Sequence, residues 1–88
     1  MDEVIVEDYK VDAGDFGIRM ARLEGIVAKG LTGAKVVEVD AVIVNIHGAS
    51  VDLRAFVQDR ALDAMIEAIK NQWWSNTMHR REAVGERA

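Results

Sequence analysis

The sequence contains no cysteine and no proline. Without cysteine there is no disulfide bond, no thiolate zinc ligand and no cysteine nucleophile. Without proline no rigid linker marks a domain boundary, and a chain of 88 residues is short for two domains. We therefore expect one domain over residues 1–76, followed by a polar, charged tail over residues 77–88.

Basic charge and long apolar runs are also scarce. The 15 aspartates and glutamates outnumber the 11 lysines and arginines, which gives a formal net charge of −4. Nucleic-acid binding relies on cations that neutralise phosphates, so this balance argues against it. No apolar run approaches the roughly 18 residues of a membrane span, and the acidic start lacks the basic and apolar regions of a signal peptide. We expect a soluble, cytoplasmic protein that binds neither nucleic acid nor membrane.

Metal ligands and catalytic motifs are missing as well. The only histidines are His47 and His79, and their separation does not match a metal-ligand spacing. The segment Asp12–Asp15 has too few oxygen ligands in the required order for a calcium loop. We expect no metal and no cofactor, and the sequence favours a non-catalytic protein while leaving enzymatic activity open.

The first third of the chain predicts a strand, a turn and a helix. Apolar residues alternate over Val4–Val11, as in a half-buried strand. Asp12–Asp15 predicts a turn, with Asp15 as the N-cap of a helix. A helical spacing of apolar residues then predicts a helix over about residues 16–29. The residues that carry this spacing are Phe16, Met20, Leu23 and Val27.

The middle of the chain predicts a β-hairpin. The alternation within Lys35–His47 changes parity at Asp40–Ala41, which indicates either one bulged strand or two strands. Gly48–Ala49 is typical of a two-residue turn, and the resulting register places all the apolar partners on one face. In the alternative, Ser50 is the N-cap of one long helix. The predicted cross-strand pairs are Ile46 with Val51, Val44 with Leu53, and Val42 with Ala55.

A second helix follows, and the order of elements gives a fold class. We expect this helix to begin with Asp59 as its N-cap and to end near Ser75–Asn76, with the tail either loosely held or extending it. The order is β-α-β-β-α, an α+β arrangement. It corresponds to the ferredoxin-like split βαβ pattern without its fourth strand, with two helices on one face of an antiparallel three-stranded sheet. The predicted core face of the second helix is Leu62, Ile66, Ile69 and Trp73, with Met65 beside it.

The polar face of the predicted hairpin is the first candidate site. It combines a histidine, a serine and an aspartate, which are the residue types of a catalytic triad. A hairpin that faces solvent lacks a pocket to exclude water, so we expect a surface that binds a ligand or a partner, or an ordinary polar sheet face. The residues of this surface are Asn45, His47, Ser50, Asp52 and Arg54.

A second candidate site is an interface with another protein chain. Without a fourth strand, the apolar first strand lies at an open sheet edge, and such edges invite pairing. Glycines within a helix cost about 1 kcal/mol each, and the close approach of another helix would explain them. Tryptophan is enriched at interfaces, and Trp74 points away from the core position of Trp73. The interface candidates are Val4, Ile5, Val6, Gly17, Ala21, Gly25 and Trp74.

One family resemblance concerns the predicted hairpin and the helix after it. Ala41–Ile46 followed by Val51–Leu53 is similar to the layout of the small effector proteins of bacterial multicomponent monooxygenases. The resemblance covers about half of the chain and implies a coupling role in an oxygenase complex. Our main prediction is instead a small non-catalytic interaction or regulatory module, which acts as a homo-oligomer or as a small subunit of a larger complex. A domain that binds a small ligand is a further alternative.

Overall fold

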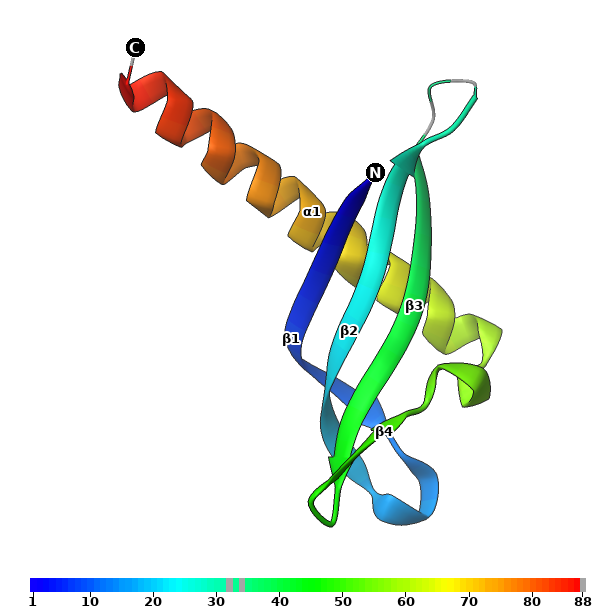
Figure 1. The fold of residues 1–88 in the computed structure, drawn as a ribbon. Helices are drawn as coiled ribbons and strands as arrows, with labels where there is room; N and C mark the ends of the chain where they lie inside the picture. The colour runs from blue at the N-terminus through cyan, green and yellow to red at the C-terminus, as the bar shows by residue number, and fades with distance from the viewer. Residues whose placement is uncertain (32, 34, 88) are drawn as a thin grey trace.

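The structure, a computed structural model, describes the backbone of residues 1–31, 33 and 35–87, and the side chains in these ranges as far as residue 79. Within these ranges, four antiparallel strands form one sheet in the order β1-β2-β3-β4, and one α-helix crosses one of its faces (Figure 1). The elements are β1 (Asp2–Asp12), the 3₁₀ turn η1 (Gly14–Phe16), β2 (Ile18–Lys29), β3 (Lys35–Ile46), β4 (Ala49–Asp52), the 3₁₀ turn η2 (Arg54–Phe56) and α1 (Asp59–Arg87).

The helix predicted over about residues 16–29 is wrong, because this segment is strand β2. Its buried residues, Ala21, Leu23, Gly25 and Val27, follow the two-residue period of a strand. The helical spacing that begins at Phe16 shares two of these positions by coincidence, and the remaining residues suit a helix as well as a strand. Pairing with β1 on one side and β3 on the other decides the conformation, since strand preference depends strongly on such neighbours.

The predicted fold class is therefore wrong. The described residues form a four-stranded sheet and a single α-helix in place of a three-stranded sheet under two helices. Each strand pairs with the next along the chain, so there is no crossover of the kind that defines a split βαβ unit. The expected turn after β1 is present, but η1 leads directly into β2, and Asp15 lies within this turn instead of capping a helix.

The parity change in β3 is a β-bulge. Glu24 pairs with Ala41 and Gly25 pairs with Val39, so Asp40 is the extra residue. β3 is thus one continuous bulged strand, which was one of the two alternatives predicted from the sequence. A second register shift lies in β1, between Val6 and Tyr9. Bulges increase the local twist of a sheet, and Figure 1 shows the strands turning strongly along their length.

The β3–β4 hairpin exists, with its turn one residue earlier than predicted. His47 and Gly48 have φ angles of 51° and 85°, and such left-handed pairs are typical of tight hairpin turns. Ile46 pairs with Ala49 and Val44 with Val51, so the register differs from the predicted one by two residues. A shift of two preserves the face of every side chain. The strand ends at Asp52, so the predicted pairs with Leu53 and Ala55 do not form.

Helix α1 packs its first half against one face of the sheet. Ile69 and Met65 are buried, and Leu62, Ile66 and Trp73 pack against the core from its margin. The strands contribute the rest of the core, which includes Val4, Leu23, Val27, Val39, Val42 and Val44.

Gly25 explains how closely the helix approaches the sheet. A Cβ atom at this position would lie 2.8 Å from the carbonyl oxygen of Glu38 and 2.9 Å from Cδ1 of Ile69. Any side chain here would therefore force the helix and the sheet apart. The close approach of a helix, which the sequence suggested for this glycine, is real, but the glycine lies on a strand.

The second half of α1 continues past the sheet. The helix begins at Asp59, as predicted, and extends through the expected tail to Arg87. Figure 1 shows it crossing behind the strands and projecting beyond the edge formed by β1. No helix in the described part of the chain has both the length and the apolar character needed to cross a membrane.

Candidate functional site

The structure places the predicted hairpin surface on the face of the sheet opposite α1, or at its end. Asn45, His47, Ser50 and Asp52 are exposed, and Arg54 is half-buried in η2. Asn45 and Ser50 are direct cross-strand partners, and Asp52 lies opposite Ile43. The exposure agrees with the parity argument, whereas a ligand or partner at this surface stays a prediction.

Three of these residues hold the hairpin together. The Oδ1 atom of Asp52 accepts hydrogen bonds from the backbone N–H groups of Val42 and Arg54, both at 2.9 Å. The Nε group of Arg54 donates to the carbonyl oxygen of Val39 at 2.7 Å. The Oδ1 atom of Asn45 accepts from the N–H of Gly48 at 2.9 Å, inside the turn. Their polar groups thus have a structural explanation at the end of β4 and in the turn.

His47 lies at one end of the sheet, where two turns meet. Its ring packs edge-on against that of Phe16, with 6.3 Å between the ring centroids. This contact links the β3–β4 turn to η1. His47 forms no hydrogen bond with Ser50 or Asp52 among the described residues, so the arrangement lacks the base–orienter contact of a triad.

The predicted interface residues occupy very different places. Val4, Ala21 and Gly25 are buried on the face that α1 covers, Val6 is half-buried, and Gly17 is exposed next to η1. The stripe of small residues predicted on a helix is therefore divided between the core and a turn. Ile5 is exposed on the opposite face of β1, which is an edge strand as expected.

Trp73 and Trp74 lie where α1 leaves the sheet. Trp73 is half-buried, and its Nε1 group donates a 2.7 Å hydrogen bond to Asp2. Trp74 is exposed. The ammonium group of Lys35 lies 4.1 Å from the ring centroid of Trp73 and 5.4 Å from that of Trp74. This cluster joins the start of β3 and the start of β1 to the helix.

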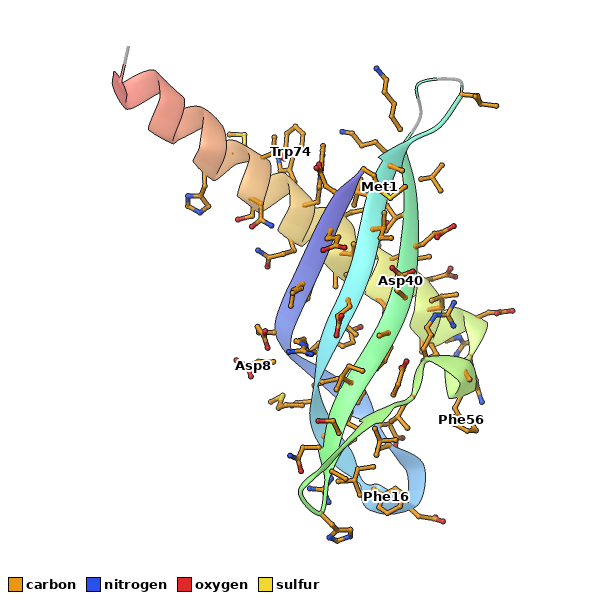
Figure 2. All side chains as sticks on the ribbon, viewed as in Figure 1. Met1, Asp8, Phe16, Asp40, Phe56 and Trp74 are labelled. Atoms are coloured by element: carbon orange, nitrogen blue, oxygen red, sulfur yellow. The ribbon has the colours of Figure 1, made fainter. Side chains whose placement is uncertain are left out.

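A further hollow is an apolar groove that the sequence did not reveal. It has a volume of about 620 Å³ and lies on the helix-covered face, between the second half of β1, η1, η2 and the start of α1. Because α1 crosses the sheet obliquely, this part of the face has no helix over it. The groove is bordered by two exposed phenylalanines, Phe16 and Phe56 (Figure 2). Its other apolar lining includes Tyr9, Val11, Leu53, Val57 and Met65.

Chemically, this groove suits binding more than catalysis. Its polar groups are Lys10, Asp12 and Gln58, which are exposed. Across the described side chains, no charged or polar residue is buried, and no three potential metal ligands gather in one place. A pocket of several hundred Å³ with apolar walls and a few polar groups is typical of a binding site.

Comparison of the chain with protein-family models, with curated proteins and with solved structures finds no match. The resemblance to monooxygenase effector proteins therefore rests on strand alternation alone. The assignment of a function has to come from the surfaces themselves.

Phe56 gives the one signal by which the groove could have been suspected from the sequence. It is a large apolar residue directly before a helix start, outside any strand or helix pattern, and it is 80% exposed. The other walls come from three separate segments, residues 9–16, Val42 and residues 53–65, so no local pattern brings them together.

Proposed function

We propose that the protein is a non-catalytic interaction module that receives an apolar helical segment of a partner protein in the groove beside α1. The observation that carries the proposal is the combination of a groove of about 620 Å³ with Phe56, which is 80% exposed beside it. Exposed apolar surface of this extent in a small protein is typical of an interaction site.

A protein partner fits this surface better than a small molecule does. A small molecule could fill the groove, but it would leave the outward side of Phe56 in water. Only a larger partner covers the groove and both bordering rings, Phe16 and Phe56, at once. Aromatic residues are enriched at the centres of protein interfaces, where their burial contributes most to affinity.

A helix is the form of partner that the surroundings favour. α1 already packs on the same face of the sheet, and its residues Ala61 and Met65 form one wall of the groove. A second helix, about 10 Å across, would lie beside α1 and complete the layer over the sheet. The exposed side chain of Gln58, just before α1, lies where it would contact the polar face of such an amphipathic helix.

Photo-crosslinking tests this proposal. A benzoylphenylalanine replaces Phe56 in the full chain, which is expressed in its own cells. We expect a crosslink to one protein at an amphipathic segment, and we expect a synthetic peptide of that segment to bind the purified protein. Absence of a protein crosslink, or a peptide that does not bind, would overturn the proposal.

Two alanine positions on α1 provide a matched control. Ala61 lines the groove and Ala64 does not, and both are exposed on the same helix. Ala61→Trp should fill the groove and abolish both the crosslink and peptide binding, whereas Ala64→Trp should leave them unchanged. Equal effects of the two variants would show that the groove is not the binding site.

A small apolar ligand is a second candidate, because the volume lies within the range of ligand pockets of about 300–1,000 Å³. Native mass spectrometry of the protein purified from its own cells distinguishes the two. A bound small molecule that is lost in Ala61→Trp and kept in Ala64→Trp would support this candidate.

A further inference from the structure

The face of the sheet opposite α1 has no cover among the described residues. Figure 1 shows the helix on the far side of the strands, and the side chains of Figure 2 that point to the viewer come from this bare face. Large apolar side chains on it remain exposed, including Ile5 at 50% and Met20 at 58%. Ile26 and Ile43 are half-buried beside them.

The central strand β2 gives this bare face a pattern that is complementary to itself. Its side chains there run apolar, apolar, basic, acidic, apolar, apolar. If β2 of a second copy is laid on this strand in the opposite direction, each charged residue faces a residue of opposite charge and each apolar residue faces another apolar residue. In order, these residues are Ile18, Met20, Arg22, Glu24, Ile26 and Ala28.

The neighbouring strands continue the same pattern. On β1, Glu3 lies beside Ile26 and Lys10 lies beside Met20, so the two rows that the reversal exchanges carry one acid and one base. On β3, Ala41 lies beside Glu24 and Ile43 lies beside Arg22. The central charges of the face are therefore bordered on this side by two apolar residues. A hollow of about 240 Å³ lies near Met20 and Ile43. In a second copy that runs in the opposite direction, Ile26 would face Met20 and Ala41 would face Ile43.

We propose that two copies of this chain pack bare face to bare face. The two-fold axis lies between the two sheets, runs across the strands at right angles to them, and passes between Arg22 and Glu24. In this arrangement Arg22 of each copy meets Glu24 of the other, Glu3 meets Lys10, and Met20 meets Ile26. A two-fold axis along the strands would instead bring acid onto acid. The charges therefore select one orientation out of two.

The central charges give the interface its register. Arg22 and Glu24 already form an ion pair of 3.1 Å within one chain, and both side chains remain about half exposed. In the pair of copies they become an alternating square of two arginines and two glutamates, so each charge gains a second counter-charge. Such charge patterns act mainly on specificity and orientation.

The available area suits a reversible dimer. Three long strands, each of about 12 residues at about 3.3 Å per residue and spaced about 4.8 Å apart, make a face of roughly 600 Å² before side-chain relief is counted. This is somewhat below the roughly 800 Å² per partner of a standard interface. The second sheet would lie about 10 Å away, as in β-sandwiches.

Sedimentation of three purified forms tests the proposal. The wild type should pass from monomer to dimer with rising concentration. Arg22→Glu alone, or Glu24→Arg alone, should weaken dimerisation at least about tenfold, because each places four like charges around the axis. An equimolar mixture of the two single variants should recover dimers of one copy of each, because every acid then faces a base in the other chain.

The mixing step separates an interface from a role within one chain. Each single variant has lost its internal ion pair, and mixing cannot restore that pair. Arg60→Glu and Asp63→Arg, which make the same charge changes on exposed positions of α1, should leave dimerisation unchanged. A wild type that stays monomeric up to about millimolar concentration, single variants that dimerise normally, or a mixture that stays monomeric would each overturn the proposal.

Discussion

The two faces of the sheet differ in how much of their surface this chain itself buries. On the face toward α1, every inward position of β2 between Ala21 and Val27 is apolar and buried. On the bare face of the same strand, apolar residues lie on both sides of Arg22 and Glu24 and stay partly exposed. The difference shows how the two-residue period of a strand divides one segment between contacts within the chain and contacts available to other chains.

The covered face is itself unfinished at one end. α1 lies over the sheet from Leu62 to Trp73, and the groove beside its first turns is left open. The comparison therefore distinguishes three regions: a closed core, an apolar groove on the covered face, and a bare face of mixed charge. The predictions below test whether these regions differ as proposed.

The largest expected difference is between Ile69 and Ile5. Ile69 of α1 is fully buried against the sheet, whereas Ile5 is half exposed on the bare face. Ile69→Ala should lower the free energy of unfolding by about 2–5 kcal/mol, and Ile5→Ala by less than about 1 kcal/mol. Denaturant unfolding at low protein concentration measures both. If Ile69→Ala does not fold, Ile69→Val should still cost about 0.5–1.5 kcal/mol; similar costs at the two sites would contradict the assignment of faces.

Gly25 tests the close contact between helix and sheet. Gly25→Ala should destabilise the protein by about 1–3 kcal/mol, because the added Cβ collides with a backbone carbonyl and with Ile69. Ala28→Val adds atoms to the bare face of the same strand and should change the free energy of unfolding by less than about 0.5 kcal/mol. A Gly25→Ala variant as stable as the wild type would mean that the helix lies farther from the sheet.

Asp52 tests whether the hairpin surface serves structure first. Asp52→Ala removes the acceptor of two backbone N–H groups and should cost about 1–2 kcal/mol. Asp52→Asn keeps an oxygen at the same place and should recover part of this loss. Ser50→Ala, on the same face, should have little effect on thermal unfolding; if it matched Asp52→Ala, the structural role of Asp52 would be refuted.

The smallest expected effect separates the two tryptophans. Trp73→Phe loses the hydrogen bond to Asp2 and should cost about 1 kcal/mol in denaturant unfolding. Trp74→Phe keeps an aromatic ring beside Lys35 at an exposed position and should cost less than about 0.5 kcal/mol. The reverse order would contradict the packing at the end of the sheet.

The sequence predicted elements well where one period was clear. The helix start at Asp59 was predicted from its capping residue. Alternation predicted the hairpin and gave a bulge near Asp40 as one of two alternatives, and the structure selects these. β2 was missed because Leu23 and Val27 fit both a helical and a strand spacing. Its conformation depends on β1 and β3, which are not sequence neighbours, and this tertiary contribution is absent from a local pattern.

The candidate site was harder to predict than the fold. The polar hairpin residues were chosen as a candidate site because they are close in sequence. In the structure, the side chains of Asn45, Asp52 and Arg54 form hydrogen bonds with backbone groups. The groove combines β1, η2 and α1, so it appears only once the chain is folded. Phe56 was the single visible sign, as a large apolar residue between the predicted hairpin and the predicted helix.

The central claim is that the bare face meets a second copy while the groove stays free for a different partner. Because the chain has no cysteine, single variants Ala41→Cys, on the bare face near the proposed axis, and Ala61→Cys, in the groove, each carry one unique thiol. A short bismaleimide should convert Ala41→Cys to a covalent dimer and leave Ala61→Cys monomeric. A covalent dimer through position 61, or none through position 41, would contradict the account.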